Sequence, residues 1–443
     1  MREFHKGDIQ SHIIHLSWPM VLANVVQNIA SIFELFLLGR IGLEALAAIS
    51  IVMSSVFALN LSVHGGLING AIAIISRHAG AKKHEEINKV LVQMFIFGAF
   101  VFGLFSLTIF IFLNPILEFF GAKGDVLIMA SGYIKIFLLS FLPFSIYTIG
   151  MAALRSAGDS ITPLRVIMVM MFFNIILNPI FIVVLHMGVK GAALSALVMN
   201  TAAAVYYIVV LNRGIHFFRI RLSDIRIDLK LMSKYAFLAL KSIGQGFTGD
   251  LGTIALLKIV SAYGNPMIAA YGIVGKLVYY LLMFGWPIGN SGGLILGQNL
   301  GMNIKERARQ TVIETIKVFG YLSLPVSVCF FVFARQILQL FSSDPVVLQY
   351  GILYLRLMGL VMPLFGAGLN IQSSFNGAGS TGTPTVVTFI SFIMIRIPLA
   401  MLLPILPAIG RDGVFMAVAV SMAVYALIYI ALYNRGNWIN KEI

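Results

Sequence analysis

Long apolar runs separated by short polar breaks dominate the sequence. Each run is close to the ~20 residues that an α-helix needs to cross ~30 Å of hydrocarbon. Backbone groups in lipid must find their hydrogen bonds within their own segment, so such runs predict membrane-spanning helices. The predicted spans are twelve: 13–38, 47–75, 91–114, 127–152, 166–185, 191–212, 235–260, 266–296, 312–334, 348–373, 385–406 and 413–434. The pattern therefore predicts an all-α integral membrane protein with twelve transmembrane helices.

The composition supports this reading. Hydrophobic residues make up 59% of the chain and charged residues 11%, with a mean hydropathy of +0.94. A soluble domain is about one quarter charged, so this chain cannot cover itself with polar groups, and we expect the lipid bilayer as its partner. The formal net charge of +14 would suggest nucleic acid in a soluble protein. In a membrane protein, basic residues orient the loops, and we expect no nucleic acid.

The basic residues alternate from loop to loop. With the N-terminus placed inside, the inside segments hold 19 Lys and Arg residues and the outside loops hold 5. The positive-inside rule then places both termini in the cytoplasm and supports the number of spans. We expect a multi-pass protein of the cell inner (plasma) membrane, and a monomer.

The two halves of the chain repeat each other at a nearly constant offset. The matching positions, 221 or 222 residues apart, are Gly42 with Gly264, Ala157-Gly158 with Ala378-Gly379, Thr162-Pro163 with Thr383-Pro384, Gly188 with Gly410, and Gly191 with Gly413. Six spans per half is an even number, so the repeat is parallel, about an axis along the membrane normal. The sequence predicts an N-terminal six-helix lobe at 1–212, a polar cytoplasmic linker at 213–234 and a C-terminal six-helix lobe at 235–443.

Two carboxylates fall clearly inside predicted spans, Glu34 in the first and Asp250 in the seventh. An ionisable group in hydrocarbon costs a few kcal/mol or more, which makes it a candidate functional residue. The repeat pairs Asn28, rather than Glu34, with Asp250. The two acids are therefore offset by about six residues, or roughly 9 Å, along equivalent helices.

Glu34 has no basic partner within its own span, because no Lys or Arg lies between Pro19 and Arg40. A buried acid without a cation is poised to exchange a proton near neutral pH. The alternative is an ion pair between Glu34 and Arg40 at the outer interface.

Asn174 and Asn178 are the polar candidates to accompany Glu34. They lie four residues apart on one face of the fifth span, and Pro179 should loosen the backbone after them. Together with Glu34 they form a candidate ion-coupling site for H⁺, or for Na⁺ held at Glu34 and Asn178. The alternative is packing of asparagines between helices, which membrane proteins commonly use.

The second half carries cations instead. Lys276 and Arg396 fall near mid-span, in the same half as Asp250. In one interpretation Asp250 neutralises one of them within an internal charge network. In the other, the surplus positive charge binds an anionic group of a substrate. With Asn28, these residues form the candidate substrate-binding site or charge network.

Several short motifs resemble the multidrug and toxic compound extrusion (MATE) family, in the family's order and in both halves. They are Leu16-Ser17-Trp18-Pro19-Met20, the stretch from Gly39 to Ala48, Ala153 to Asp159 with Thr162-Pro163, Asn174 to Pro179, Gly188 with Gly191-Ala192-Ala193, and Gly297-Gln298-Asn299 with Gly301. The resemblance implies a V-shaped pair of six-helix lobes. It also implies export of organic cations and drugs in exchange for H⁺ or Na⁺, by alternating inward and outward openings.

The resemblance assigns roles to particular residues. An acid midway along the first span is implicated in coupling in the family, and Glu34 stands at that position. Asn178 stands where some relatives have Asp, and Ala30 where archaeal relatives have a Tyr. Asp250 lies in the span where Na⁺-coupled relatives carry an acid. The resemblance thus implies a coupling site with one carboxylate in place of two.

The leading hypothesis is a secondary active antiporter that exports amphipathic, cationic drugs or metabolites, with no cofactor beyond the coupling ion. The alternative is a flippase for an anionic lipid-linked substrate of the same superfamily, suggested by the second-half cations. A major-facilitator transporter would need a G-x-x-x-D-R-x-G-R-type loop, which residues 77–89 lack. We expect no enzyme activity, since the sequence offers no convergent nucleophile, metal site or acid pair.

Overall fold

The computed structural model describes residues 4–215, 218–219 and 226–441. Residues 216–217 and 220–225, part of the predicted linker, lie outside the described residues. The described chain is almost entirely helical, and eleven of its helices are long and apolar enough to cross a membrane. The remaining predicted span, 235–260, lies within α9 (Leu229–Ser261), a helix of 33 residues that carries four lysines and Asp250. The all-helical fold of long spans is confirmed.

The chain divides into two compact units, Trp18–Leu240 with the first two residues and Lys241–Ile443 with Glu3–Ser17. The first unit contains most of α1 (Ile9–Gly39), α2 (Leu43–Val52), the π-helix η1 (Met53–Phe57), α3 (Ala58–Gly80), α4 (His84–Ile111), α5 (Leu113–Phe119), α6 (Gly124–Ser156), α7 (Ile161–Pro179), the π-helix η2 (Ile180–Val184), α8 (Val189–Arg213) and the start of α9.

The second unit contains the first turns of α1 and the greater part of α9. Its other helices are α10 (Asn265–Gly301), α11 (Lys305–Val332), α12 (Ala334–Gln339), α13 (Pro345–Gly377), α14 (Gly382–Phe389), the π-helix η4 (Ile390–Ile395), α15 (Arg396–Leu402), the short 3₁₀ segments η5 (Leu403–Ile405) and η6 (Gly410–Asp412), α16 (Gly413–Arg435) and η7 (Asn437–Asn440). Each predicted span lies on one of these helices or on a run of them, although α4 and α11 begin seven residues before their predicted spans. Three predicted spans are divided: the second into α2, η1 and α3, the fifth into α7 and η2, and the eleventh into α14, η4, α15 and η5.

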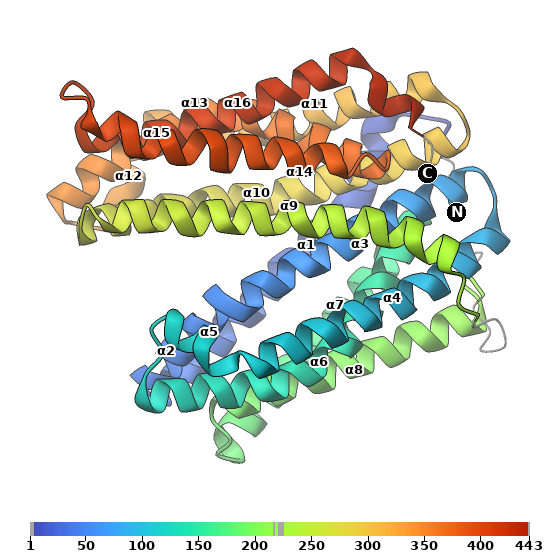
Figure 1. Ribbon diagram of the computed structural model, residues 1–443, viewed down its shortest axis with the longest axis horizontal. Coiled ribbons are helices and arrows are strands. Elements are labelled where there is room, and N and C mark those ends of the chain that lie inside the picture. The colour runs from blue at the N-terminus through green and yellow to red at the C-terminus, as the bar shows by residue number, and fades with distance from the viewer. Residues whose placement is uncertain (1–3, 216–217, 220–225, 442–443) are drawn as a thin grey trace. The chain divides into compact units, whose positions relative to one another are not determined.

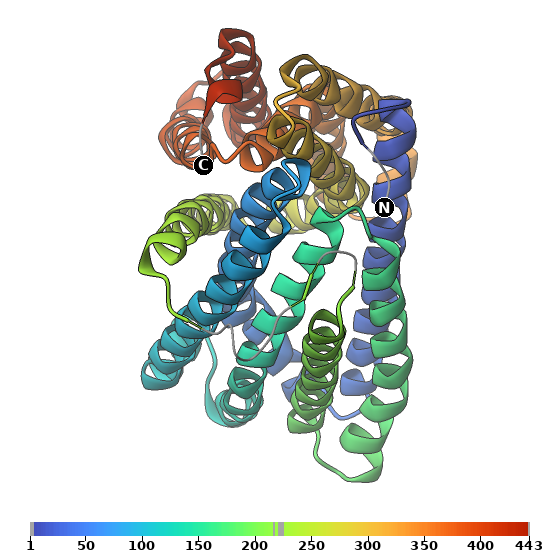
Figure 2. The same cartoon turned by 90° about the vertical axis from the view of Figure 1, so that its right-hand side faces the viewer.

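Each unit is a bundle of long helices that run side by side (Figures 1 and 2). In the first unit α6 is central, because it packs against α2, α3, α4 and α8. In the second unit α13 is central and packs against α10, α11 and α16. Large apolar side chains such as Phe141 in the first unit and Phe415 in the second are fully buried, while many others face outward, as lipid solvation requires.

The glycines that mark the sequence repeat have the same backbone role in both units. Gly188 and Gly410 each have φ +57°, and Gly158 and Gly379 have φ +90° and +78°. Residues with a Cβ rarely adopt these left-handed conformations. The repeat therefore marks the turns that end one span and start the next.

A second pair of repeat glycines permits close contact between successive spans. A Cβ on Gly191, at the start of α8, would lie 2.6 Å from the backbone of Phe181 in η2. A Cβ on Gly413, at the start of α16, would lie 2.7 Å from the backbone of Leu403 in η5. In each unit the last span thus begins in backbone contact with the end of the preceding span.

The basic loops lie at the same ends of the units as the linker and the terminal segments. In α4, Gln93 donates to Arg226 O over 2.6 Å and accepts from the Asp228 amide, so the described end of the linker lies on the first turns of that helix. In the second unit Arg307, at the start of α11, donates to the carbonyls of Phe4, Lys6 and Gly7. The cytoplasmic placement of these ends stays a prediction.

Helix contact in the second unit depends on glycine at one crossing of α10 and α13. A Cβ on Gly377 would lie 2.3 Å from Gly293 O, a rigid backbone atom. We expect Gly377→Ala to destabilise the protein by about 1–3 kcal/mol, as overpacking of a close-packed core does. Thermal unfolding of the purified protein measures this loss. Gly320→Ala on α11, whose Cβ would meet open space, is the control and should leave the unfolding temperature unchanged or higher.

Candidate ion-coupling site

A chain of polar side chains crosses the interior of the first unit from α1 to α8. Asn178 hydrogen-bonds the Glu34 carboxyl. The Asn178 amide Nδ2 also donates to Asn174 Oδ1 over 3.0 Å, and Asn174 Nδ2 donates to Ser195 Oγ over 3.3 Å. The structure therefore brings together Glu34, Asn174 and Asn178, which the sequence singled out separately, and adds Ser195.

The local sequence of α7 places the two asparagines. Their spacing of four residues puts both on one helix face, and Asn178 is completely buried. Pro179 has no N–H to donate, and the helix continues as the π-helix η2. A π-turn inside a helix is uncommon and frequent at functional sites. The predicted loosening of the backbone after the asparagines takes this form.

Helix α8 brings Ser195 to the network. Gly191 allows the start of α8 to touch the backbone of η2, and Ser195 lies one turn further along the same face. The Ser195 side chain is fully buried. The small residues from Gly191 onward thus set the distance between α7 and α8 at which the Asn174 bond forms.

Asn178 has unused hydrogen-bonding capacity. Its Oδ1 is buried and has no partner among the described residues. An ionised Glu34 can only accept hydrogen bonds, so the contact with Asn178 uses the amide N–H. The neighbouring Oδ1 remains available to accept a hydrogen bond from the O–H of a neutral Glu34 or to bind a cation. Tyr133 of α6, 3% exposed, lies close enough to Glu34 to feel its charge.

The alternative partner of Glu34, Arg40, lies elsewhere. Its guanidinium carbon is 4.5 Å from the centre of the Phe36 ring, and the residue is exposed. Within the described part of the chain, Glu34 and Arg40 form no ion pair. The structure therefore places the acid against amides in the interior.

Arg396, in the second unit, is surrounded by neutral groups. It is 5% exposed, its Nε donates to Ser421 Oγ over 2.9 Å, and its guanidinium carbon is 3.9 Å from the centre of the Phe392 ring. Tyr271 and Tyr354 also lie within electrostatic range. A cation over an aromatic face gains about 0.5–2 kcal/mol, which compensates part of the cost of burial. Arg396 Nη2 has no partner among the described residues.

The other candidates of the network are spread over different helices. Asn28 of α1 donates from Nδ2 to Asn24 O over 2.9 Å and is partly buried. Asp250 of α9 is partly buried, and Lys276 of α10 is exposed. The pairing of Asp250 with a cation stays a prediction.

Sequence reasoning missed Ser195 and Tyr133. Both are uncharged, so the search for ionisable residues within spans passed over them. The Gly191-Ala192-Ala193 run was a usable signal for Ser195, because small residues permit close helix approach. Tyr133 had no comparable signal. A further polar pair in α3 was also missed: Asn60 is fully buried and His64 stacks on Phe144, with ring centres 4.3 Å apart.

The candidate coupling site offers one carboxylate and neutral oxygens as ligands. In the described part of the chain, no group of three or more His, Cys, Asp or Glu side chains could hold a metal ion. The groups near Glu34 are one carboxylate and neutral oxygens. Such hard oxygen ligands suit a proton or a weakly bound alkali cation better than zinc or copper.

The comparisons with known proteins cover nearly the whole chain. The MatE family model matches residues 19–180 and 246–402, one segment in each unit. The chain belongs to the MATE family. Among its relatives are the probable multidrug resistance protein YpnP of Bacillus subtilis, 25% identical over 98% of this chain and 97% of YpnP, and the multidrug export protein MepA of Staphylococcus aureus, 25% identical over 96% of this chain and 93% of MepA.

Solved structures of MATE transporters share the fold. A transporter of the MOP superfamily from Pyrococcus furiosus, described as having a binding pocket of reverse polarity, superposes with a TM-score of 0.90 at 21% identity, over 99% of this chain and 98% of its own. An outward-facing multidrug resistance MATE transporter gives 0.90 at 22% identity, over 98% of both chains.

Membership of the MATE family decides several expectations. Members of the family are transporters, so this chain is a multi-pass membrane transporter and not an enzyme, as predicted. The relatives reported above are named for multidrug export or resistance. These names do not favour the flippase alternative, which rested on the second-half cations alone, and Arg396 already has aromatic and hydroxyl neighbours within the protein.

Proposed function

We propose that this MATE transporter is a secondary active antiporter. It exports amphipathic, cationic drugs or metabolites in exchange for H⁺ or Na⁺, by alternating access in the plasma membrane. The observation that carries the coupling role is the Glu34 carboxyl hydrogen-bonded to Asn178 inside the first unit. The multidrug names of relatives that match at full length support the substrate class.

The charge state of Glu34 controls the hydrogen bonds of Asn178. When Glu34 is ionised, it accepts from the Asn178 amide N–H₂. When Glu34 is protonated, its O–H becomes a donor, and Asn178 Oδ1, on the side chain that Glu34 contacts, is a buried acceptor without a partner among the described residues. Turning the amide toward this bond would disturb its donation to Asn174 and, through Asn174, the contact with Ser195. Protonation would thus repack α1 against α7 and α8.

A sodium ion could use the same atoms. The Glu34 carboxylate supplies the charge and Asn178 Oδ1 a neutral oxygen, both ligands that hard cations prefer. Binding a cation and binding a proton both neutralise Glu34 and both draw on Asn178 Oδ1. The two ions are therefore alternatives for one site, and transport under separate pH and Na⁺ gradients distinguishes them.

Replacing Asn178 tests whether its side-chain amide takes part in coupling. We expect Asn178→Leu to lower gradient-driven export in proteoliposomes by roughly tenfold or more, because a hydrogen bond to a charged group is worth about 1.5–3 kcal/mol. Asn200→Leu, a partly buried asparagine of α8, is the matched control and should retain export. Normal export by Asn178→Leu under either gradient would remove the amide from the mechanism.

A further inference from the structure

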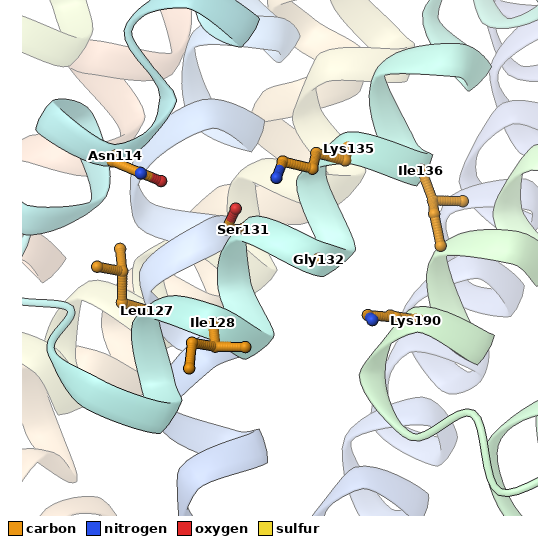
Figure 3. Close-up of a pocket in the computed structure, with 8 residues that line it drawn as sticks. All are labelled: Asn114, Leu127, Ile128, Ser131, Gly132, Lys135, Ile136 and Lys190. Atoms are coloured by element: carbon orange, nitrogen blue, oxygen red, sulfur yellow. The ribbon is translucent and has the colours of Figure 1, made fainter.

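A second polar site lies in the first unit, outside the coupling network. A cavity of about 490 Å³ opens among α5, α6 and α8. Its polar lining is Asn114 of α5, Ser131 and Lys135 of α6, and Lys190 of α8. Figure 3 shows the side chains of Asn114, Ser131 and Lys135 directed toward a common space. Lys190 lines the same pocket from α8, so two cations, a hydroxyl and an amide border one cavity.

Among the described residues, the polar groups of this pocket lack partners. In the described part of the chain, Ser131, Lys135 and Lys190 form no hydrogen bond or ion pair. Ser131 is only 8% exposed, and buried hydroxyls in helices usually bond to a carbonyl of the preceding turn. The hydroxyl of a largely buried serine that opens onto a pocket beside two unpaired lysines is arranged for a ligand that accepts hydrogen bonds and carries negative charge.

A glycine positions the second lysine. A Cβ on Gly132 would lie 2.7 Å from Lys190 Cε. The Lys190 side chain therefore lies across α6 in the space that Gly132 leaves, one residue from Ser131. This contact joins the start of α8 to the pocket on α6.

The surface around the pocket is apolar and runs along one face of α6. Ile128, Gly132, Lys135, Leu139 and Leu142 follow one another at spacings of four and three residues, which is a single helix face. Ile128 is 67% exposed, Leu139 65% and Leu142 48%. In a membrane-spanning helix such exposed apolar residues contact lipid chains. Lysine in this position extends its ammonium toward the headgroup region.

We propose that this pocket binds the phosphate group of an anionic phospholipid. The two ammonium groups and the Ser131 hydroxyl hold the phosphate oxygens, and the acyl chains lie along Leu139 and Leu142. A zwitterionic lipid carries the same phosphate but adds a cation, which the lysine pair disfavours. The lipid is a bound constituent of the first unit and is distinct from the transported substrate.

Lipid retention by the purified transporter tests the site. Native mass spectrometry of the protein in detergent with equal amounts of phosphatidylglycerol and phosphatidylcholine should show preferential retention of phosphatidylglycerol. Lys135→Ala and Lys190→Ala should each reduce that retention about fivefold, the effect expected of one lysine near a phosphate. Lys123→Ala, which removes a lysine just before α6 that does not line the pocket, should retain the lipid as the unchanged protein does.

Two further measurements distinguish the position of Lys190 from its charge, and a bound lipid from free phosphate. Gly132→Ala keeps both lysines but displaces Lys190, and should weaken retention as Lys190→Ala does. Inorganic phosphate should compete with the lipid only at far higher concentration. Equal retention of the two lipids, equal losses in Lys123→Ala and Lys135→Ala, or tight binding of inorganic phosphate without lipid retention would each overturn the proposal.

Discussion

Replacing Glu34 with glutamine is expected to abolish gradient-driven export while leaving the fold intact. Glutamine keeps the size and the hydrogen-bonding capacity of the side chain but can neither release a proton nor hold a cation by charge. We expect export in proteoliposomes under an imposed pH or Na⁺ gradient to fall at least about tenfold, because the sole acid of the network carries the ion. Thermal unfolding should be unchanged or improved, since an ionisable group in the hydrocarbon is removed.

A second acid in the same unit, Glu44, is the control for the loss of one negative charge. Glu44 lies in the first turn of α2, in the same unit, and is exposed. Glu44→Gln should export at the rate of the unchanged protein. Export by Glu34→Gln at the rate of Glu44→Gln would contradict coupling through Glu34.

The second large effect is expected at Gly191. A Cβ there would lie 2.6 Å from both the carbonyl carbon and the carbonyl oxygen of Phe181. Gly191→Ala must therefore push the start of α8 away from η2. Because Ser195 is one turn further along α8, its contact with Asn174 should be lost as well. We expect lower thermal stability by about 1–3 kcal/mol and, in the protein that remains folded, export reduced several-fold.

Two other glycines show which part of that loss belongs to the coupling site. Gly413→Ala creates the same backbone clash at the repeat-related position of the second unit. It should cost similar stability without touching the Glu34 network, so export per folded molecule should fall less. Gly103→Ala on α4 meets open space and should change neither quantity. Equal export by the Gly191 and Gly413 variants would show that the Gly191 effect is on stability alone.

Much of the fold could be predicted from the sequence because lipid imposes strict rules on a chain. A helical span must be largely apolar, and an α-helix satisfies its backbone hydrogen bonds within its own segment, so apolar runs locate the helices closely. The repeat could be detected because Gly188 and Gly410 need left-handed backbone, and Gly191 and Gly413 need backbone contact. Few other residues meet these needs, so the glycines persist in both halves.

The parts that could not be predicted depend on exact backbone register or on uncharged side chains. The π-helices η1, η2 and η4 shift the register within runs that read as uniform apolar segments. Glu34, Asn174 and Asn178 were found because charge and paired amides are conspicuous in hydrocarbon. Ser195 and Tyr133 differ little in sequence from other serines and tyrosines of the spans, and only packing brings Ser195 to Asn174 and Tyr133 near Glu34.

We propose that Glu34 couples ion movement to substrate movement. The direct measurement is ion flux driven by substrate: proteoliposomes without an imposed ion gradient receive a gradient of a cationic dye substrate, and fluorescent reporters record internal pH and Na⁺. We predict that the unchanged protein moves H⁺ or Na⁺ opposite to the dye and that Glu34→Gln moves neither ion. Dye movement by the unchanged protein with no ion flux, or the same ion flux in Glu34→Gln, would contradict it.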